Sequence, residues 1–123
     1  VDILRSLTLD FEVFADAGFL LGHASFVCIP KSFSAVEYAK HLFAFTAHES
    51  CGKCFPCRLG ATRGKEMLES ALEKDQKFSE ELINDLLETM EVGSLCALGG
   101  GLPLAIKNLL EHCTDEFKPL MEK

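Results

Sequence analysis

The sequence predicts a mainly α-helical protein, in which a small four-helix bundle follows a short β-containing stretch. Three observations lead to this fold class. From residue 32 onward, apolar residues recur at the three- and four-residue spacing of amphipathic helices. Helix-start signals stand before several of these apolar segments. Only residues 24–29 read as a strand, because they form a short run with β-branched and aromatic side chains that ends at Pro30.

The chain of 123 residues divides into two expected parts, residues 1–31 with the strand and residues 32–123 with the helices. A single strand cannot pair with itself, so its partner would come from residues 1–14 or from chain outside this sequence. The sequence begins with Val1 rather than Met. We therefore expect it to be a piece of a longer polypeptide.

The first two helices are predicted on either side of a loop. A capping box at Ser34-Ala-Val-Glu37 begins the first helix, which runs to about His48. The second helix covers residues 57–73, although Gly60 and Gly64 weaken its pattern.

The next two helices complete the predicted bundle. Ser79 is the expected N-cap of a helix over residues 79–91, with Glu80 and Glu81 in its first turn. A proline is favoured in the first turn of a helix, so the fourth helix is predicted to begin at Pro103. Short loops joining four helices of this length are typical of a small bundle.

Charge and hydropathy exclude several classes of function. Twelve lysines and arginines against 19 aspartates and glutamates give a net charge of −7. Nucleic-acid binding and attraction to an anionic membrane need clustered basic residues instead. No apolar run approaches the roughly 18 residues of a spanning helix, and no secretory signal opens the chain. We expect a cytoplasmic protein.

Six cysteines are the most informative residues, and three of them form the run Cys51-Gly-Lys-Cys54-Phe-Pro-Cys57. This C-x2-C-x2-C spacing is typical of iron–sulfur ligation. In a bacterial ferredoxin a fourth cysteine follows after three residues, but here that position is Ala61. The fourth ligand must therefore come from elsewhere in the chain.

Cys96 is the predicted fourth ligand. It lies in the glycine-flanked segment 93–101, where the backbone can approach a bulky cofactor closely. Helices 57–73 and 79–91 would form an antiparallel hairpin, which returns the chain to the end where the cysteine run lies. The predicted metal and cofactor ligands are therefore Cys51, Cys54, Cys57 and Cys96.

A basic segment surrounds the cysteine run. Its four cations fall in a window without acidic residues, and they are Lys53, Arg58, Arg63 and Lys65. They would stabilise a negatively charged cluster and raise its reduction potential, or they are ordinary solvated surface charges.

Several alternative readings stay open at this stage. Four cysteines also make a closed structural zinc site, although zinc ribbons usually use two separated C-x2-C pairs. Cys51-Gly-Lys-Cys54 could act as a redox dithiol, but the thioredoxin-like context is missing. His48 is a possible extra ligand or neighbour of the cluster, whereas Cys28 and Cys113 are expected to be inert core thiols.

Two segments together resemble a known family. Glu49-Ser-Cys-Gly-Lys-Cys-Phe-Pro-Cys-Arg58 and Gly93-Ser-Leu-Cys-Ala-Leu-Gly-Gly-Gly101 are similar to the C-terminal iron–sulfur domain of NADH-oxidising flavoprotein subunits. That group includes subunits of respiratory complex I, NAD-reducing nickel–iron hydrogenases and NAD-dependent formate dehydrogenases. The second segment resembles the hydrogenase and formate dehydrogenase branches more than complex I. Residues 9–29 resemble the tail of a ubiquitin-like β-grasp module that precedes the helical domain in this family.

The resemblance implies an electron-transfer module. Cys51, Cys54, Cys57 and Cys96 would hold one [4Fe–4S] cluster that relays single electrons between FMN and partner iron–sulfur subunits. FMN and NAD would bind to an upstream domain, because no phosphate-binding glycine motif can be written through this sequence. The fragment would then hold no complete active site, and its parent would be most like a NAD-reducing hydrogenase on the cytoplasmic or matrix side of a membrane. The alternative is a docking domain whose fold is stabilised by a zinc ion or a cluster that has no redox role.

Overall fold

The computed structural model describes residues 5–19, 21–22, 24–25 and 27–122. The chain divides into two compact units, Val1–Pro30 and Lys31–Lys123. The first unit contains the short helix α2 (Phe11–Asp16). Asp10 begins this helix, because its carboxylate accepts hydrogen bonds from the backbone N–H groups of Glu12 and Val13 at 2.9 and 3.2 Å.

The strand predicted over residues 24–29 is wrong for the part of it that is described. Residues 24–25 and 27–30 form no strand, and position 26 lies outside the described residues. A strand is held by hydrogen bonds to a neighbouring strand. Among the described residues of this unit, the nearest regular element is a helix, so the apolar run has no strand to pair with.

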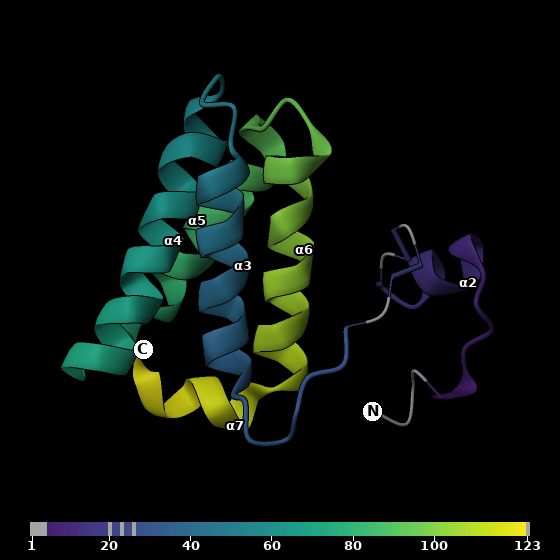
Figure 1. Cartoon of the computed structure of the whole chain (residues 1–123), viewed down its shortest axis with the longest axis horizontal. Helices are drawn as coiled ribbons and strands as arrows, with labels where there is room; N and C mark the ends of the chain where they lie inside the picture. The colour runs from purple at the N-terminus through teal and green to yellow at the C-terminus, as the bar shows by residue number, and fades with distance from the viewer. Residues whose placement is uncertain (1–4, 20, 23, 26, 123) are drawn as a thin grey trace. The chain divides into compact units, whose positions relative to one another are not determined.

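Four long helices make up most of the second unit, and the prediction of a mainly helical chain is confirmed. These helices lie side by side with nearly parallel axes (Figure 1), and they are α3 (Ala35–Glu49), α4 (Phe55–Lys74), α5 (Glu80–Gly93) and α6 (Ala97–His112). Contacts join α3 with α4, α4 with α5, α5 with α6, and α3 with α6. The predicted starts of α3 and α5 agree with the structure.

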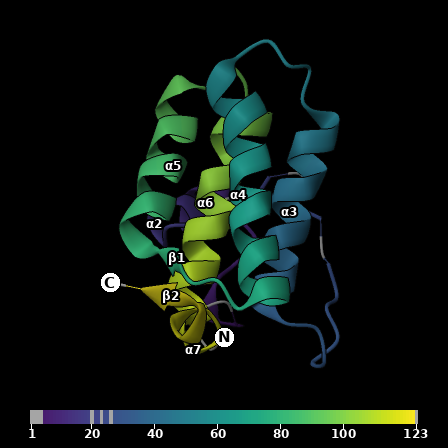
Figure 2. The ribbon, with the colours of Figure 1, turned by 90° about the vertical axis from the view of Figure 1, so that its left-hand side faces the viewer.

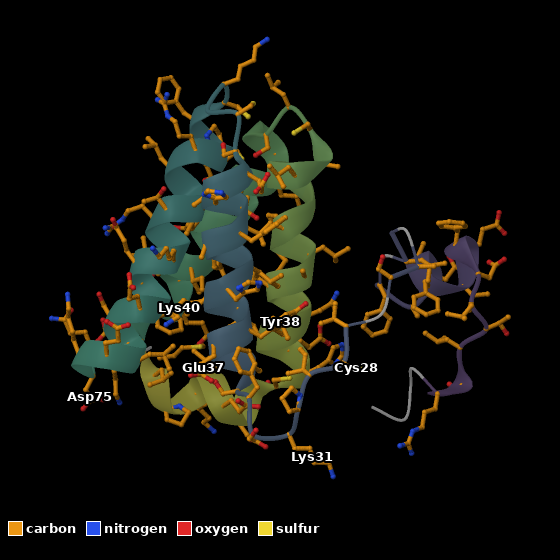
Figure 3. The ribbon with its side chains drawn as sticks, in the orientation of Figure 1. Cys28, Lys31, Glu37, Tyr38, Lys40 and Asp75 are labelled. Atoms are coloured by element: carbon orange, nitrogen blue, oxygen red, sulfur yellow. The ribbon has the colours of Figure 1, made fainter. Side chains whose placement is uncertain are left out.

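Side-chain caps explain where these helices begin and end. The Ser34 hydroxyl accepts from the Glu37 N–H at 3.0 Å, and the Glu37 carboxylate accepts from the Ser34 N–H at 3.4 Å. The Ser79 hydroxyl accepts from the Leu82 N–H at 3.3 Å. Helix α4 ends at Lys74, and Asp75 follows it as the C-cap (Figure 3). Asp75 has φ +53°, in the left-handed region that commonly ends a helix.

Helix α6 begins six residues before the predicted start at Pro103. Cys96 has an extended backbone and is the N-cap, and the Gly100 N–H donates to the Cys96 carbonyl at 3.0 Å. Pro103 therefore lies inside the helix, where it removes one backbone hydrogen bond and is buried in the core. The earlier start places Cys96 at a helix N-terminus instead of in the middle of a loop.

The core runs between the four long helices. Its fully buried large side chains come from every one of these helices and from the C-terminal segment, and they are Phe43, Leu68, Ile83, Leu87, Met90, Pro103, Ile106 and Phe117. No helix in the described part of the chain is both long and apolar enough to cross a membrane.

The C-terminal segment closes one end of this unit. It comprises α7 (Thr114–Phe117), a 3-10 turn at Lys118–Leu120 and β2 (Met121–Glu122), which pairs in parallel with β1 (Phe78–Ser79) (Figure 2). The Glu116 carboxylate also accepts a hydrogen bond from the Ala35 N–H at 2.8 Å. At the opposite end α3 joins α4 and α5 joins α6, and these two connections contain the predicted site (Figure 1).

Candidate metal centre

The four cysteines predicted as ligands all lie at one end of the helical unit. Cys51 is in the loop between α3 and α4, Cys54 is the N-cap of α4, and Cys57 is in its first turn. Cys96 is the N-cap of α6. Figure 1 shows both connecting loops at the same end of the four helices.

Glycine and arginine shape the first loop. Gly52 has φ +76°, a left-handed conformation that favours glycine, and its N–H donates to the Ser50 hydroxyl at 3.2 Å. The Arg58 guanidinium donates to the Gly52 carbonyl at 3.2 Å and lies 4.8 Å from the centre of the Phe55 ring. Arg58 therefore ties the loop back onto the start of α4.

The two loops contact each other around Cys57, which is only 3% exposed. A Cβ atom added to Gly99 would lie 2.6 Å from the Cβ and 2.9 Å from the Sγ of Cys57. A Cβ added to Gly93 would similarly lie 2.7 Å from the Cγ of Pro56. The end of α5 and the start of α6 thus approach the first turn of α4 as closely as only glycine allows.

Two serine hydroxyls lie near the Cys57 sulfur, and sequence reasoning missed both. The Ser50 Oγ is 3.4 Å from the Cys57 Sγ. The Ser94 Oγ lies 2.7 Å from the point that a Gly99 Cβ would occupy, the same point that is 2.9 Å from the Cys57 Sγ. Among the described buried side-chain oxygens and nitrogens, the Ser94 Oγ is the one without a hydrogen-bond partner. The available signal was sequence adjacency, since Ser50 precedes Cys51 and Ser94 lies two residues before Cys96.

The four thiols share this end of the molecule but do not converge on one point. Cys51 and Cys96 are exposed and Cys54 is partly buried. Within the described residues, no three histidine, cysteine, aspartate or glutamate side chains are grouped closely enough to hold a metal ion. Thiols bond one another only weakly, so convergence of such loops depends on the ion or cluster that binds them.

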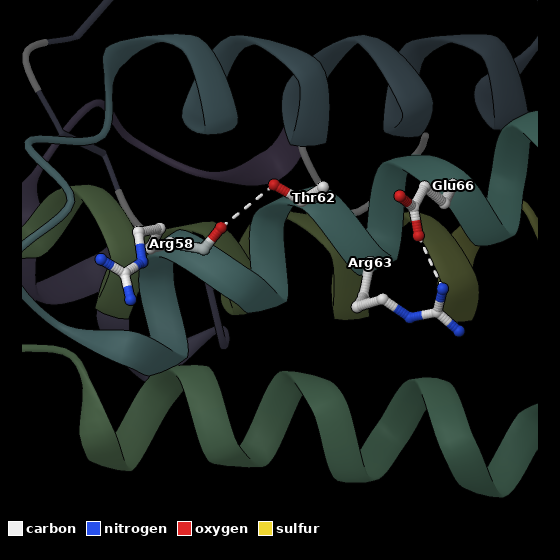
Figure 4. A network of polar contacts seen from close by, with 4 residues as sticks. All are labelled: Arg58, Thr62, Arg63 and Glu66. Atoms are coloured by element: carbon white, nitrogen blue, oxygen red, sulfur yellow. Dashed lines mark hydrogen bonds and ion pairs between the residues drawn. The ribbon is translucent and has the colours of Figure 1, made fainter.

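Two of the cations predicted around the cysteine run have different partners in the structure. Arg63 forms an ion pair with Glu66 at 2.6 Å, so its charge is largely compensated one helical turn away (Figure 4). Arg58 directs its guanidinium to the Gly52 carbonyl instead. The first turns of α4 and α6, which carry no acidic residue, contribute backbone N–H groups and positive helix-dipole ends.

The remaining cysteines and the nearby histidine differ in exposure and partners. Cys28 is exposed, so its prediction as a core thiol is wrong. Cys113 is partly buried against the core, and burial, followed by the carboxylate of Glu116, raises the pKa of its thiol. The His48 side chain is 86% exposed, and its Nε2 lies 3.8 Å from the Glu49 carboxylate.

The residues present fit a thiolate-bound inorganic group. Four sulfur donors with no carboxylate or imidazole among them suit iron–sulfur or zinc chemistry. Gly99 lets the start of α6 pack directly against Cys57, and the unpartnered Ser94 hydroxyl is available to a negatively charged sulfur. Fold and donor set together define a small helical domain with four cysteines at one end, in and beside two helix connections.

Comparison with known proteins agrees with this class. Residues 37–120 match the profile of the NADH-ubiquinone oxidoreductase-F iron–sulfur binding region. The chain therefore belongs to this family, and its cofactor is a [4Fe–4S] cluster.

Named relatives come from bacteria and fungi. One NADH-quinone oxidoreductase subunit of Rhizobium meliloti (strain 1021) is 31% identical over 121 residues, which are 98% of this chain and 27% of the relative. The mitochondrial NADH-ubiquinone oxidoreductase 51 kDa subunit of Neurospora crassa is 32% identical over 94% of this chain and 24% of its own length. An NADH-quinone oxidoreductase subunit of Streptomyces coelicolor is 32% identical over 89% of this chain and 25% of its own length. The chain spans about a quarter of the length of these curated relatives.

Proposed function

We propose that this chain is an electron-transfer module in which Cys51, Cys54, Cys57 and Cys96 bind one [4Fe–4S] cluster. In this proposal residues 32–123 form a four-helix cluster-binding bundle, and residues 1–31 belong to a ubiquitin-like module. The observation that carries this proposal is the contact between the first turn of α4 and the first turn of α6. There Gly99 brings the backbone of α6 against Cys57.

The cluster supplies reversible one-electron chemistry. The protein residues limit access of water, fix the course of the first loop and set the charge environment. Cys57 is buried, so water is kept from that side of the site. Arg58 and Gly52 fix the course of the first loop, and the N-termini of α4 and α6 direct N–H groups and positive dipole ends toward the sulfur donors. The N–H groups and dipole ends stabilise negative charge and so raise the reduction potential of a thiolate-bound cluster, whereas the burial of Cys57 acts in the opposite direction.

The wider context of the module follows from the relatives. Their printed names describe subunits of NADH-quinone and NADH-ubiquinone oxidoreductases, and this chain corresponds to about a quarter of their length. We place the module in a longer NADH-oxidising chain with FMN and NAD on an upstream domain, which passes electrons to partner iron–sulfur subunits. These names favour a parent of the respiratory type over the hydrogenase type that the second cysteine segment suggested. A peripheral complex on the cytoplasmic or matrix side of a membrane is the corresponding location.

Iron, sulfide and spectroscopy test this function directly. The full-length protein that contains these residues should be purified without oxygen and compared with its Cys57→Ser variant. We expect about four iron and four sulfide atoms per chain for a [4Fe–4S] cluster, a broad visible absorption, and an EPR signal after reduction by NADH. The Cys57→Ser variant should lose most of the iron.

A matched substitution and two contrary outcomes complete the test. Cys113→Ser changes a cysteine that packs against the core near the other end of α6 and should keep the full iron content. One zinc ion per chain, without iron or sulfide, would contradict the iron–sulfur assignment. A cluster that NADH never reduces would instead favour the docking domain without a redox role.

A further inference from the structure

The environment of the Cys57 sulfur differs from that of the other three proposed ligands. Cys57 is buried, whereas Cys51 and Cys96 are exposed and Cys54 is partly buried. Its sulfur has a serine hydroxyl from each cysteine loop beside it, Ser50 from the first and Ser94 from the second.

The Ser50 hydroxyl is oriented to donate toward this sulfur. Its oxygen accepts the Gly52 N–H at 3.2 Å, which leaves its own hydrogen for the Cys57 Sγ at 3.4 Å. A thiolate has no hydrogen to give, so the hydroxyl must be the donor once Cys57 binds a cluster. Deprotonation of Cys57, and not the Gly52 contact, therefore sets the direction of this hydrogen bond.

The Ser94 hydroxyl is the unexplained group at this site. Its oxygen is buried and has no hydrogen-bond partner, which costs free energy in a folded protein unless a partner binds there. A Cβ atom at Gly99 would lie 2.7 Å from the Ser94 Oγ and 2.9 Å from the Cys57 Sγ. The distance between this oxygen and this sulfur therefore cannot exceed the sum of these two lengths. A negatively charged sulfur, either the Cys57 thiolate or a sulfide of a bound cluster, would be a suitable acceptor for the Ser94 hydroxyl.

We propose, on the basis of the function above, that Ser94 and Ser50 are positioning residues that set the reduction potential of the cluster. Ser50 donates to the Cys57 sulfur, and Ser94 donates to the Cys57 sulfur or to a cluster sulfide beside it. A hydrogen bond to charged sulfur strengthens as negative charge accumulates, so it stabilises the reduced cluster more than the oxidised one. Both hydroxyls therefore raise the potential, and Ser94 does so from the second loop.

The test is an EPR-monitored redox titration of the full-length protein with Ser94→Ala and Ser94→Thr. Ser94→Ala should keep its iron content and lower the ratio of reduced to oxidised cluster at a fixed poise by about threefold to tenfold, since one hydrogen bond to charge is lost. Ser94→Thr keeps the hydroxyl and should retain a potential close to that of the native protein. Ser79→Ala is the matched control, because it removes a serine hydroxyl that caps α5 away from the site.

Each other outcome would overturn the proposal. An unchanged potential in Ser94→Ala, an equal shift in Ser94→Thr, or an equal shift in Ser79→Ala would show that the hydroxyl does not act on the cluster. Loss of the cluster in Ser94→Ala would show that Ser94 serves assembly instead of potential. A native protein without iron and sulfide would contradict the electron-transfer function itself, and this result is separate from all of the others.

Discussion

Gly99 in the first turn of α6 faces Cys57 in the first turn of α4, at a distance that leaves no room for a side chain. A Cβ atom at Gly99 would lie 2.6 Å from the Cβ and 2.9 Å from the Sγ of Cys57, and such contacts are well inside van der Waals separation. Gly99 and Cys57 are 42 positions apart in the sequence. The first turns of α4 and α6 can pack this closely only because Gly99 has no side chain.

Gly99→Ala should damage the site and the packing together. The new methyl group has to push Cys57 or Ser94 aside, and overpacking of this kind costs about 1–3 kcal/mol. We expect a lower free energy of unfolding in urea and a reduced iron content per chain. Both quantities can be measured on the same anaerobic preparation.

Gly101→Ala is the matched control for this prediction. Gly101 lies in the same helix, and nothing stands within 4 Å of the position where its Cβ would be. Alanine there should leave the iron content unchanged and add up to about 1 kcal/mol of stability, because glycine is the poorer helix former. Equal losses of iron in the two variants would contradict the steric explanation.

A second close approach, between α3 and α4, predicts a purely structural effect. A Cβ at Gly64 would lie 2.2 Å from Cε1 of the buried Phe43 ring, and a rigid ring cannot move aside as a flexible chain can. Gly64→Ala should therefore lower the free energy of unfolding by about 1–3 kcal/mol. Urea denaturation followed by circular dichroism measures the loss.

The double variant Gly64→Ala with Phe43→Leu separates this clash from a general loss of stability. Leucine is smaller than phenylalanine and vacates part of the space that the new methyl group needs. The double variant should lose less stability than the two single variants together, because the two sites are in contact. Strictly additive losses would show that the Phe43 ring is not what opposes alanine.

Local signals in the sequence were sufficient for most of the helical unit. The capping box at Ser34 and Glu37 and the cap at Ser79 satisfy backbone groups of their own helices, so they can be recognised without tertiary information. Pro103 misled, because proline is favoured in a first turn but is also tolerated inside a helix that packing holds in place. The strand over 24–29 was overpredicted, because strand formation depends on a partner and not on the run itself.

The cysteine spacing likewise indicated which residues share one end of the molecule, but not their surroundings. Three cysteines in one run and a helical hairpin were enough to predict that Cys96 lies at the same end of the helical unit as Cys57. The orphaned hydroxyl of Ser94 and the compensated charge of Arg63 depend on side-chain positions, which neither composition nor spacing encodes. Serine is too common in loops for its proximity to cysteine to be a signal by itself.

Alkylation should separate the two cysteines that the proposed cluster leaves free. Cys28 is exposed, whereas Cys113 is partly buried and its thiol pKa is raised. Since the thiolate is the reacting form, Cys113 should label more slowly than Cys28 at neutral pH, and its rate should rise as the pH is increased. Mass spectrometry of peptides after timed iodoacetamide labelling gives both rates. Denaturation should make the rates similar, and equal rates in the native protein would contradict the burial of Cys113.

Arg58 and Arg63 are predicted to differ in importance although they lie near each other on α4. Arg58 fixes the first cysteine loop through the Gly52 carbonyl and the Phe55 ring, while Arg63 is paired with Glu66 on the helix surface (Figure 4). In Arg58→Gln the loop loses both contacts, so iron should pass to a chelator about threefold to tenfold faster, as expected for the loss of about one hydrogen bond.

Arg63→Gln carries the same change of charge and is therefore the control. An exposed pair contributes little to stability, and its cation is already compensated, so the chelation rate should stay within about twofold of the native rate. Bleaching of the visible absorption under anaerobic conditions records both rates. If both variants lost iron equally fast, net positive charge would be what retains the cluster. A difference confined to Arg58→Gln would instead mean that the loop is held by the guanidinium at the Gly52 carbonyl.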